Sequence, residues 1–139
     1  MSDATTAPEG FTPQNLIDPF ERFVGPLFDR DEDGQRVVAF RVDERHLGPD
    51  RVHVHEGQLM TFADASLGCT AYWDNDHVPC VTLSMQVSFL SFPKLGDLVE
   101  CRARFTRKTR SVLFVEGDFT VAGEPVMTAT SLWKVLGAK

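Results

Sequence analysis

The segment from His55 to Gly68, HEGQLMTFADASLG, combines a histidine, a glycine turn and a carboxylate, residue types that can act together on an ester. A helix starting near Gly57 would carry Asp64 on an otherwise apolar stripe. The stripe forms at offsets of four, three and four residues: Met60, Asp64, Leu67 and Ala71. Because burying an unpaired charge is costly, this carboxylate is expected to be paired, capped or used. The helix start would supply free N–H groups that stabilise an oxyanion, so the segment favours acyl-ester chemistry.

The composition is that of one soluble globular domain without a nucleic-acid partner. The chain has 139 residues, of which 42% are hydrophobic and 24% charged, and this suits a single core. A net charge of −6 disfavours non-specific binding to nucleic acids. The first ten residues lack the features of a signal peptide, and no apolar run approaches the roughly 18 residues of a membrane span, so a cytoplasmic location is expected. The three cysteines lack a CxxC spacing and are interpreted as reduced core thiols: Cys69, Cys80 and Cys101.

Turn signals and periodicity divide the part of the chain that precedes the helix. Residues 1–12 are polar and small, which predicts a flexible N-terminal tail ahead of a single domain over 13–139. A short helix is predicted over 13–23 from a proline at its start and apolar residues at helical spacing. Two strands around an Asp-Gly turn over 29–34 predict a β-hairpin, and a loop over 43–54 leads to the long helix.

The chain after the helix is almost entirely β. The helix itself is predicted over 56–72, and alternating patterns then predict four strands, over 81–90, 99–106, 111–121 and 125–136. Together with the hairpin this makes about six strands in a mainly antiparallel sheet. One long helix and one sheet must pack so that each covers the apolar face of the other. The predicted class is therefore α+β, with a long central helix wrapped by the sheet.

The order of elements and the motifs together resemble the hotdog-fold acyl-CoA thioesterases, in the branch of the phenylacetate-pathway and 4-hydroxybenzoyl-CoA enzymes. The shared pieces are a His turn nine residues before a helical carboxylate, a strand reading VTLSMQVSFL, a Gly-Asp turn and a late aromatic. They stand at His55, Asp64, 81–90, Gly96-Asp97 and Trp133. The resemblance covers about residues 25–136. It implies hydrolysis of an acyl-CoA to a free acid and coenzyme A, without a metal or redox cofactor, by a homodimer or homotetramer with sites at subunit interfaces.

The resemblance also implies a role for each matching residue. Asp64 is expected to be the catalytic carboxylate, as nucleophile or as general base on water. The backbone N–H of Glu56 is expected to hold the carbonyl oxygen, with help from the helix dipole and from His55, which shapes the turn. Thr82 is expected to orient the water. A substrate contact is expected from Gly57. Independently of the resemblance, a basic turn is interpreted either as a solvated hairpin turn or as the group that meets the coenzyme A phosphates at a subunit boundary: Arg107, Lys108 and Arg110.

The same residues permit other interpretations. Glu56 in place of the usual glycine, and the lack of the Asn that often precedes the turn, would suit a protein that binds acyl thioesters without hydrolysing them. Asp50 and His55, five residues apart, match the pair with which hotdog hydratases add water to an enoyl thioester. His53 and His55 could instead hold a metal together with Glu56. Asp64 could also be a structural carboxylate bonded to a neighbouring group.

Overall fold

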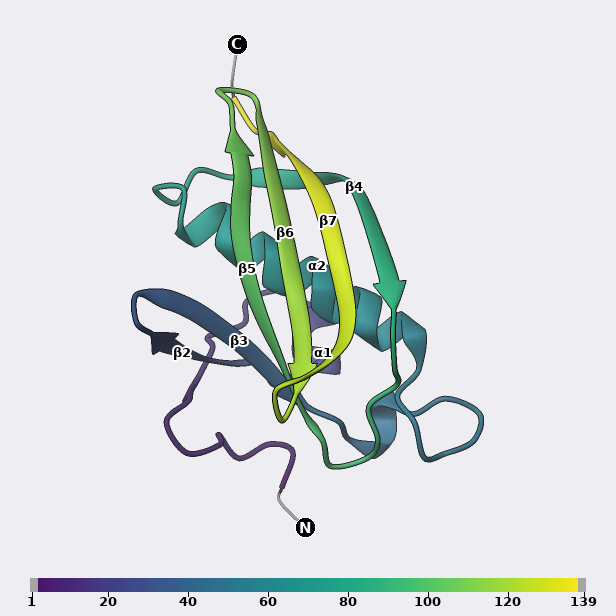
Figure 1. The fold of residues 1–139 in the computed structure, drawn as a ribbon. Helices are drawn as coiled ribbons and strands as arrows, with labels where there is room; N and C mark the ends of the chain where they lie inside the picture. Colours follow the sequence, from purple (N-terminus) through teal and green to yellow (C-terminus); the bar gives the residue numbers. More distant parts are fainter. Residues whose placement is uncertain (1–2, 138–139) are drawn as a thin grey trace.

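Helix α2 (Glu56–Trp73) lies across one antiparallel sheet in the computed structural model, which describes residues 3–137 (Figure 1). Residues 1–2 of the predicted tail and 138–139 of the predicted domain lie outside this range. The sheet has seven strands in the order β1-β2-β3-β5-β6-β7-β4. Their bounds are β1 Thr12–Pro13, β2 Phe28–Glu32, β3 Gln35–Arg41, β4 Cys80–Phe89, β5 Leu98–Lys108, β6 Val112–Val121 and β7 Glu124–Val135. The predicted α+β class is confirmed, with one short strand more than the six expected.

The core lies between α2 and the inner face of the sheet. At its centre Phe62 of α2 packs against Phe40 of β3 and Phe119 of β6, with ring centroids 4.6 and 5.7 Å apart. All three rings are fully buried, and each stabilises the fold by roughly 2 kcal/mol through apolar burial. Among residues 3–137, no helix is long and apolar enough to cross a bilayer.

The apolar stripe predicted for α2 is only half buried. Leu67 and Ala71 are fully buried, whereas Met60 and Asp64 are exposed. The buried face instead runs through these residues: Gln58, Leu59, Phe62, Ala63, Ser66, Leu67, Thr70 and Ala71. The predicted stripe therefore borders the buried face, and Asp64 is not the buried charge that the sequence suggested.

The predicted hairpin is confirmed, with a tighter turn than expected. Strands β2 and β3 pair from Phe28 to Glu32, and only Asp33 and Gly34 connect them. Both turn residues have positive φ, 51° and 87°, as in the two-residue turns whose twist matches that of the flanking strands. Glycine adopts such a φ without strain, and Asp tolerates it better than most residues.

The N-terminal helix begins later than predicted. Helix α1 spans Pro19–Val24, whereas the prediction was 13–23. Asp18 fixes its start, because its side chain accepts hydrogen bonds from the N–H groups of Phe20 at 2.8 Å and Glu21 at 3.3 Å. Ahead of the helix, Thr12–Pro13 pairs with β2 as an edge strand. The apolar spacing before Asp18 suggested an earlier start, but no cap supports one there.

A β-bulge in β4 changes which side chains face α2. The register between β4 and β7 shifts between Thr82 and Ser84, so Leu83 is an extra residue. Before the bulge, Thr82 points at α2. After it, the apolar side chains of the strand pack against the core: Met85, Val87 and Phe89. The uniform alternation predicted over 81–90 is therefore wrong at this point, and the bulge is what aims Thr82 at the helix.

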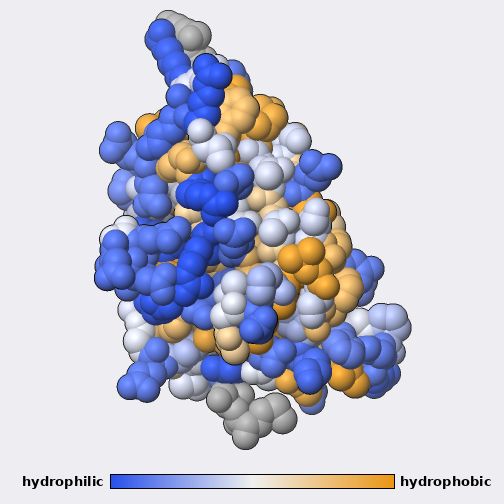
Figure 2. All heavy atoms as spheres, in the orientation of Figure 1, coloured by the Kyte–Doolittle hydropathy of each residue, from blue (hydrophilic) through white to orange (hydrophobic). Residues whose placement is uncertain are grey.

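Strand β4 is an open edge of the sheet with apolar side chains exposed on and beside it. Because β4 pairs only with β7, the backbone groups on its other side have no partner strand among the described residues. Figure 2 shows apolar side chains at the surface on the side where β4 lies in Figure 1. Those exposed on or just after the strand are Val81, Leu83, Leu90 and Phe92. Exposed edges of this kind are normally covered in native proteins.

Candidate active site

The start of α2 presents backbone N–H donors, and two histidines, His55 and His46, hold this turn in place. His55 is the N-cap, and its Nδ1 accepts a hydrogen bond from the N–H of Gly57 at 2.7 Å. The N–H of His55 in turn donates to the carbonyl oxygen of His46 at 2.7 Å. Glu56, the first helical residue, has its side chain exposed. The N–H of a first helical residue has no acceptor within its own helix, so the Glu56 N–H is available to a ligand oxygen.

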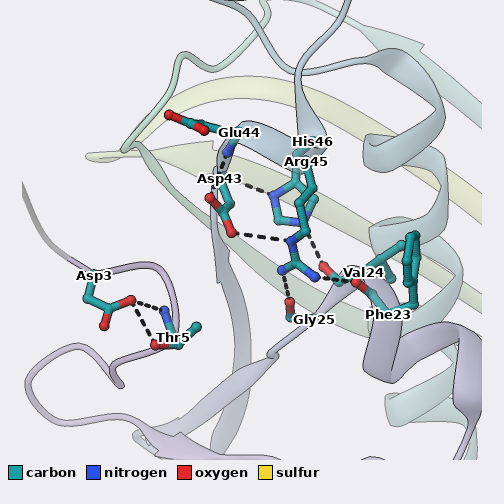
Figure 3. A network of polar contacts seen from close by, with 9 residues as sticks. All are labelled: Asp3, Thr5, Phe23, Val24, Gly25, Asp43, Glu44, Arg45 and His46. Carbon is teal, nitrogen blue, oxygen red and sulfur yellow. Dashed lines mark hydrogen bonds and ion pairs between the residues drawn. The ribbon is translucent and has the colours of Figure 1, made fainter.

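His46 and Arg45 attach this region to the end of α1 (Figure 3). The ring of His46 accepts from the N–H of Asp43 at its Nδ1, 2.9 Å away, and donates from Nε2 to the carbonyl oxygen of Val24, 2.6 Å away. Arg45 donates to the carbonyl oxygens of Phe23 and Gly25. Basic side chains suit the C-terminal end of a helix. Burial lowers the pKa of His46, which favours the neutral ring that this bonding pattern needs.

Asp64 and Thr82 form the one side-chain pair of the predicted set that the structure brings into contact. The Thr82 hydroxyl donates to Asp64 Oδ1 at 2.6 Å. The bond joins the middle of α2 to the edge strand β4, at the residue that immediately precedes the bulge. A carboxylate fixed through one oxygen keeps its second oxygen free to accept from water or to approach a carbonyl carbon. Both side chains are exposed, so a substrate can reach them.

Asp64 stands at one end of a groove of about 900 Å³, which we call the Asp64 groove. One wall is the N-terminal segment 13–18 with Glu21, and the other is the outer face of α2. The remaining lining residues come from β2, β3, β7 and the start of β4: Asp29, Arg36, Trp133, Pro79 and Cys80. The size lies within the range of clefts that bind small molecules. Burial, with the nearby Asp18 and Asp64 carboxylates, raises the pKa of Glu21 at the same end.

The helix start and Asp64 are far apart within one chain. Asp64 stands eight positions after Glu56, which corresponds to about 12 Å of rise along the helix axis. Reacting atoms must approach to roughly 3–3.5 Å, so one carbonyl cannot reach both groups of the same chain. His55 also faces a different hollow, of about 640 Å³, with Pro49 and Arg51. Each chain therefore presents two separate halves of the expected site.

The predicted phosphate-binding turn lies beyond the other end of α2. Arg107, Lys108 and Arg110 are exposed in and beside the turn between β5 and β6. The Nζ of Lys108 donates to the carbonyl oxygen of Asp74, the C-cap of α2, at 3.0 Å, and it also lies 4.2 Å from the ring centroid of Phe105. The structure does not bring this turn to His55 within one chain.

The pair expected of a hydratase is not formed. Asp50 Oδ2 lies 2.7 Å from Nδ1 of His53, and Asp50 Oδ1 accepts from the backbone N–H groups of Val52 and His53. These contacts lower the pKa of Asp50 to about 2, the backbone bonds contributing most. Asp50 is thus engaged by His53, whereas His55 caps α2. Within the described range, no three His, Cys, Asp or Glu side chains are placed to hold a metal ion.

Several groove residues were not found from the sequence. Gln14 and Arg36 lie far from Asp64 in the chain, and nothing in their local pattern distinguishes them from surface residues. Trp133 did carry a signal as the late aromatic of the resemblance. A Cβ on Gly68 would lie 2.9 Å from the Trp133 ring, so glycine is what lets α2 approach β7 at the groove.

Comparison with known proteins identifies the family. The family model of the Thioesterase superfamily matches residues 52–128, which include His55, Asp64 and Thr82. This chain belongs to the thioesterase superfamily. The Pseudomonas aeruginosa protein PA0474, whose name proposes an esterase activity, is 32% identical to this thioesterase-superfamily chain over 127 residues, covering 89% of it and 92% of the relative.

Solved structures agree with this family assignment. The phenylacetic acid degradation protein PaaI of Thermus thermophilus, solved as a point mutant, is 28% identical with a TM-score of 0.72, covering 86% of this superfamily chain and 100% of that chain. A hypothetical thioesterase of Streptococcus pneumoniae, solved with coenzyme A, is 23% identical with a TM-score of 0.73, covering 85% and 95%. The family supports thioester hydrolysis as the class of activity.

Proposed function

We propose that this protein hydrolyses an acyl-CoA thioester to a free carboxylic acid and coenzyme A. The observation that carries the proposal is the bond between Thr82 and Asp64 at the end of an open groove, in a chain of the thioesterase superfamily. Coenzyme A bound to a Streptococcus pneumoniae structure of the same fold supports this choice of thioester.

In the proposed reaction Asp64 acts as a general base. Asp64 takes a proton from water while the water oxygen bonds to the carbonyl carbon. The carbonyl oxygen becomes an oxyanion, which the Glu56 N–H and the positive end of the α2 dipole stabilise. The intermediate then collapses, the carbon–sulfur bond breaks, and the proton on Asp64 passes to the departing thiolate. Thr82 holds the carboxylate in position throughout.

The proposed site is shared by two copies of the chain. Because Glu56 and Asp64 of one chain are about 12 Å apart along α2, the oxyanion donor of one copy would complete the Asp64 half of the other. The open edge of β4, with Val81 and Leu83 exposed beside Thr82, is the surface that we propose for this pairing. A homodimer is the smallest assembly that meets this need, and a tetramer would contain two such dimers.

We also propose that the coenzyme A phosphates lie against the basic turn. Arg107, Lys108 and Arg110 together carry three positive charges on an otherwise acidic chain. The guanidinium group of arginine and the ammonium group of lysine both bind phosphate oxygens well. The location beyond one end of α2 leaves the length of the helix for the pantetheine and acyl parts of the substrate.

The first test is thiol release from short, medium, long and aromatic acyl-CoAs by the purified wild-type protein. Turnover of at least one substrate supports the proposed hydrolase. A folded protein that binds acyl-CoA in calorimetry but releases no thiol from any of them would instead be the non-catalytic binding protein, the alternative that Glu56 favours.

Mixing two variants tests whether the site is shared. Asp64→Asn removes the base, and Glu56→Pro removes the backbone N–H together with the exposed Glu56 side chain, at a position where helices accept proline and where His55 is already extended. If two chains share each site, mixed dimers contain one intact site, and random mixing restores about a quarter of wild-type turnover. If each chain works alone, the mixture stays as inactive as the separate variants.

A further inference from the structure

One carboxylate at the acidic end of the Asp64 groove has no counter-ion among residues 3–137 of its own chain. Asp18, Glu21 and Asp64 line this end together. Asp18 is engaged as the N-cap of α1, and Asp64 is bonded to Thr82. Burial, followed by the charges of Asp18 and Asp64, raises the pKa of Glu21, and no cation or donor in the described part of the chain offsets this rise. The Glu21 carboxylate therefore stands partly buried beside two like charges.

The arginines of α1 and of the groove wall are already engaged. Arg22, on α1, donates from its Nε to the carbonyl oxygen of Leu16 at 2.6 Å. Arg36, in the groove, has its Nη1 3.3 Å from Asp29 Oδ2. The acidic end therefore keeps an excess of negative charge within the range 3–137. This excess would oppose the oxyanion that the proposed reaction forms beside Asp64.

The other half of the site carries an unpaired cation. Residues 48–53, which we call the 48–53 loop, lead into the start of α2 and project from the body of the molecule near the end of β4 (Figure 1). Arg51 of this loop is exposed and lines the same hollow as His55. None of the ion pairs formed by the described residues involves its guanidinium. The oxyanion half is thus the half with a free positive charge.

The 48–53 loop holds Arg51 in a defined position. The N–H of Gly48 donates to the carbonyl oxygen of His53 at 2.9 Å, and the N–H of Arg51 donates to that of Gly48 at 3.0 Å. Arg51 has a φ of 60°, which few residues other than glycine adopt, so these bonds fix an unusual backbone conformation. Asp50, the carboxylate of the loop, is engaged by His53. Glu44 also lines the hollow, but it is not ion-paired with Arg51.

A shared site requires these two ends to meet. In the proposed reaction, Asp64 of one copy and the Glu56 N–H of the other act on the same carbonyl group, each at roughly 3–3.5 Å. The two groups then lie within about 7 Å of each other. The hollow in front of His55 in one copy must therefore face the acidic groove end of the other. Arg51 in the hollow would stand opposite carboxylates that lack a cation.

We propose that Arg51 of one copy forms an ion pair with Glu21 of the second copy, and that this pair fixes the start of α2 beside the second copy's Asp64. The inference rests on the proposed function, because the shared site decides which surfaces meet. Two-fold symmetry makes the contact occur twice in each dimer. Arg51 acts here as a positioning residue. It also offsets the negative charge around the oxyanion, so its loss should lower kcat as well as weaken the dimer.

Charge reversal on each side of the contact tests the pair. Arg51→Glu and Glu21→Arg each place like charges opposite each other in a homodimer. Close interfacial charge pairs contribute about tenfold or more to association, and two symmetric contacts square this factor. Each variant alone should therefore raise the dimer dissociation constant about a hundredfold, measured by sedimentation at a series of protein concentrations. Both substituted side chains are at least partly exposed, so the variants should fold, which circular dichroism checks.

Mixing the two variants gives the decisive measurement. In a heterodimer of Arg51→Glu with Glu21→Arg, both contacts again join opposite charges. Native mass spectrometry of the co-refolded mixture should therefore show about nine-tenths or more heterodimer, against about half for random pairing. Thiol release by the mixture should also exceed that of either variant alone. Arg51→Glu mixed with Glu124→Arg is the matched control, because Glu124 is an exposed glutamate outside the groove, and it should pair at random.

The other outcomes separate this contact from the proposed function. Random pairing of the two charge-reversed variants would overturn the inference while the hydrolase stands. An Arg51→Glu protein that dimerises like wild type but has a raised KM would place Arg51 on the substrate and would also overturn it. If wild-type dimers release no thiol from any acyl-CoA, the proposed function fails, and the pairing experiment still decides whether Arg51 and Glu21 meet.

Discussion

The two halves of the candidate site on α2 use different chemical groups, a backbone N–H in one and a side-chain carboxylate in the other. At the helix start the useful group is a backbone N–H, held by His55 and His46, and the side chain of Glu56 is turned to solvent. Two turns further on, the useful group is the side chain of Asp64, held by Thr82. A backbone donor survives almost any substitution, whereas a side-chain base survives few. A glutamate at position 56 therefore leaves the expected backbone donor in place.

The largest effect is expected from Glu56→Pro, for which Glu56→Gln is the control. Proline removes the N–H, and the loss of one oxyanion donor lowers kcat by about a hundredfold to a thousandfold. Glutamine keeps the N–H and should change kcat by no more than a few-fold, since only an exposed charge is removed. Thiol release measured under saturating substrate checks both. Equal losses in the two variants would mean that the Glu56 side chain, not its backbone, does the chemistry.

Asp64→Asn should lower kcat by about a hundredfold or more, the low end of losing a general base. The folded structure should persist, because Asp64 is exposed and asparagine can still accept from Thr82. Asp76→Asn, in the loop after α2, is the control with the same chemical change at an exposed site outside the groove. An Asp64→Asn protein as active as Asp76→Asn would show that Asp64 is a structural carboxylate.

Thr82→Val removes the hydroxyl and keeps the shape of the side chain. The loss of one hydrogen bond to a carboxylate predicts a fall in kcat of about tenfold. The expected effect is smaller than that of Asp64→Asn because the base remains but is less well oriented. Thr128→Val, at an exposed position of β7, is the matched control. Thr82→Val combined with Asp64→Asn should be no worse than Asp64→Asn alone, if threonine acts through the carboxylate.

His55→Ala should act mainly on stability. Losing the N-cap acceptor for the Gly57 N–H lowers the free energy of unfolding by about 1 kcal/mol. His55→Asn keeps a side-chain acceptor and should recover most of this loss. Urea denaturation at constant pH measures both. If the alanine variant is as stable as wild type but has lost activity, His55 contacts the substrate directly instead of shaping the helix start.

The sequence predicted which helices and strands form better than it predicted where they begin or which way their side chains point. Periodicity and turn residues are local signals, so α2, the hairpin and the four later strands could be read directly. The start of α1 could not, because a helix-like spacing runs on both sides of the Asp18 cap. The resemblance drew attention to Asp64 and to Thr82, each for a role of its own, but it did not predict that the two side chains bond to each other. Leu83 fits the alternating pattern as well as any residue of β4, so nothing local reveals it as a bulge.

The groove was least predictable of all. Gln14, Arg36 and Cys69 are brought together by three separate segments, and none belongs to a recognisable motif. Gln14 is placed by its own backbone, whose N–H donates to the carbonyl oxygen of Leu27 at 2.9 Å next to the pairing of β1 with β2. Backbone acceptors carry no sequence identity, so such contacts leave no pairwise pattern to read.

The bulge at Leu83 makes the candidate site depend on the number of residues in β4 and not only on their identity. A shift of one position in a strand turns every side chain to the opposite face. Deleting Leu83 would leave Asp64, Thr82, His55 and Glu56 all present, yet Thr82 could no longer point at α2 while the rest of β4 keeps its packing. A relative could therefore retain every expected active-site residue and still be inactive because its strand is one residue shorter. Alignments used to infer activity in this superfamily should count gaps in this strand as carefully as substitutions.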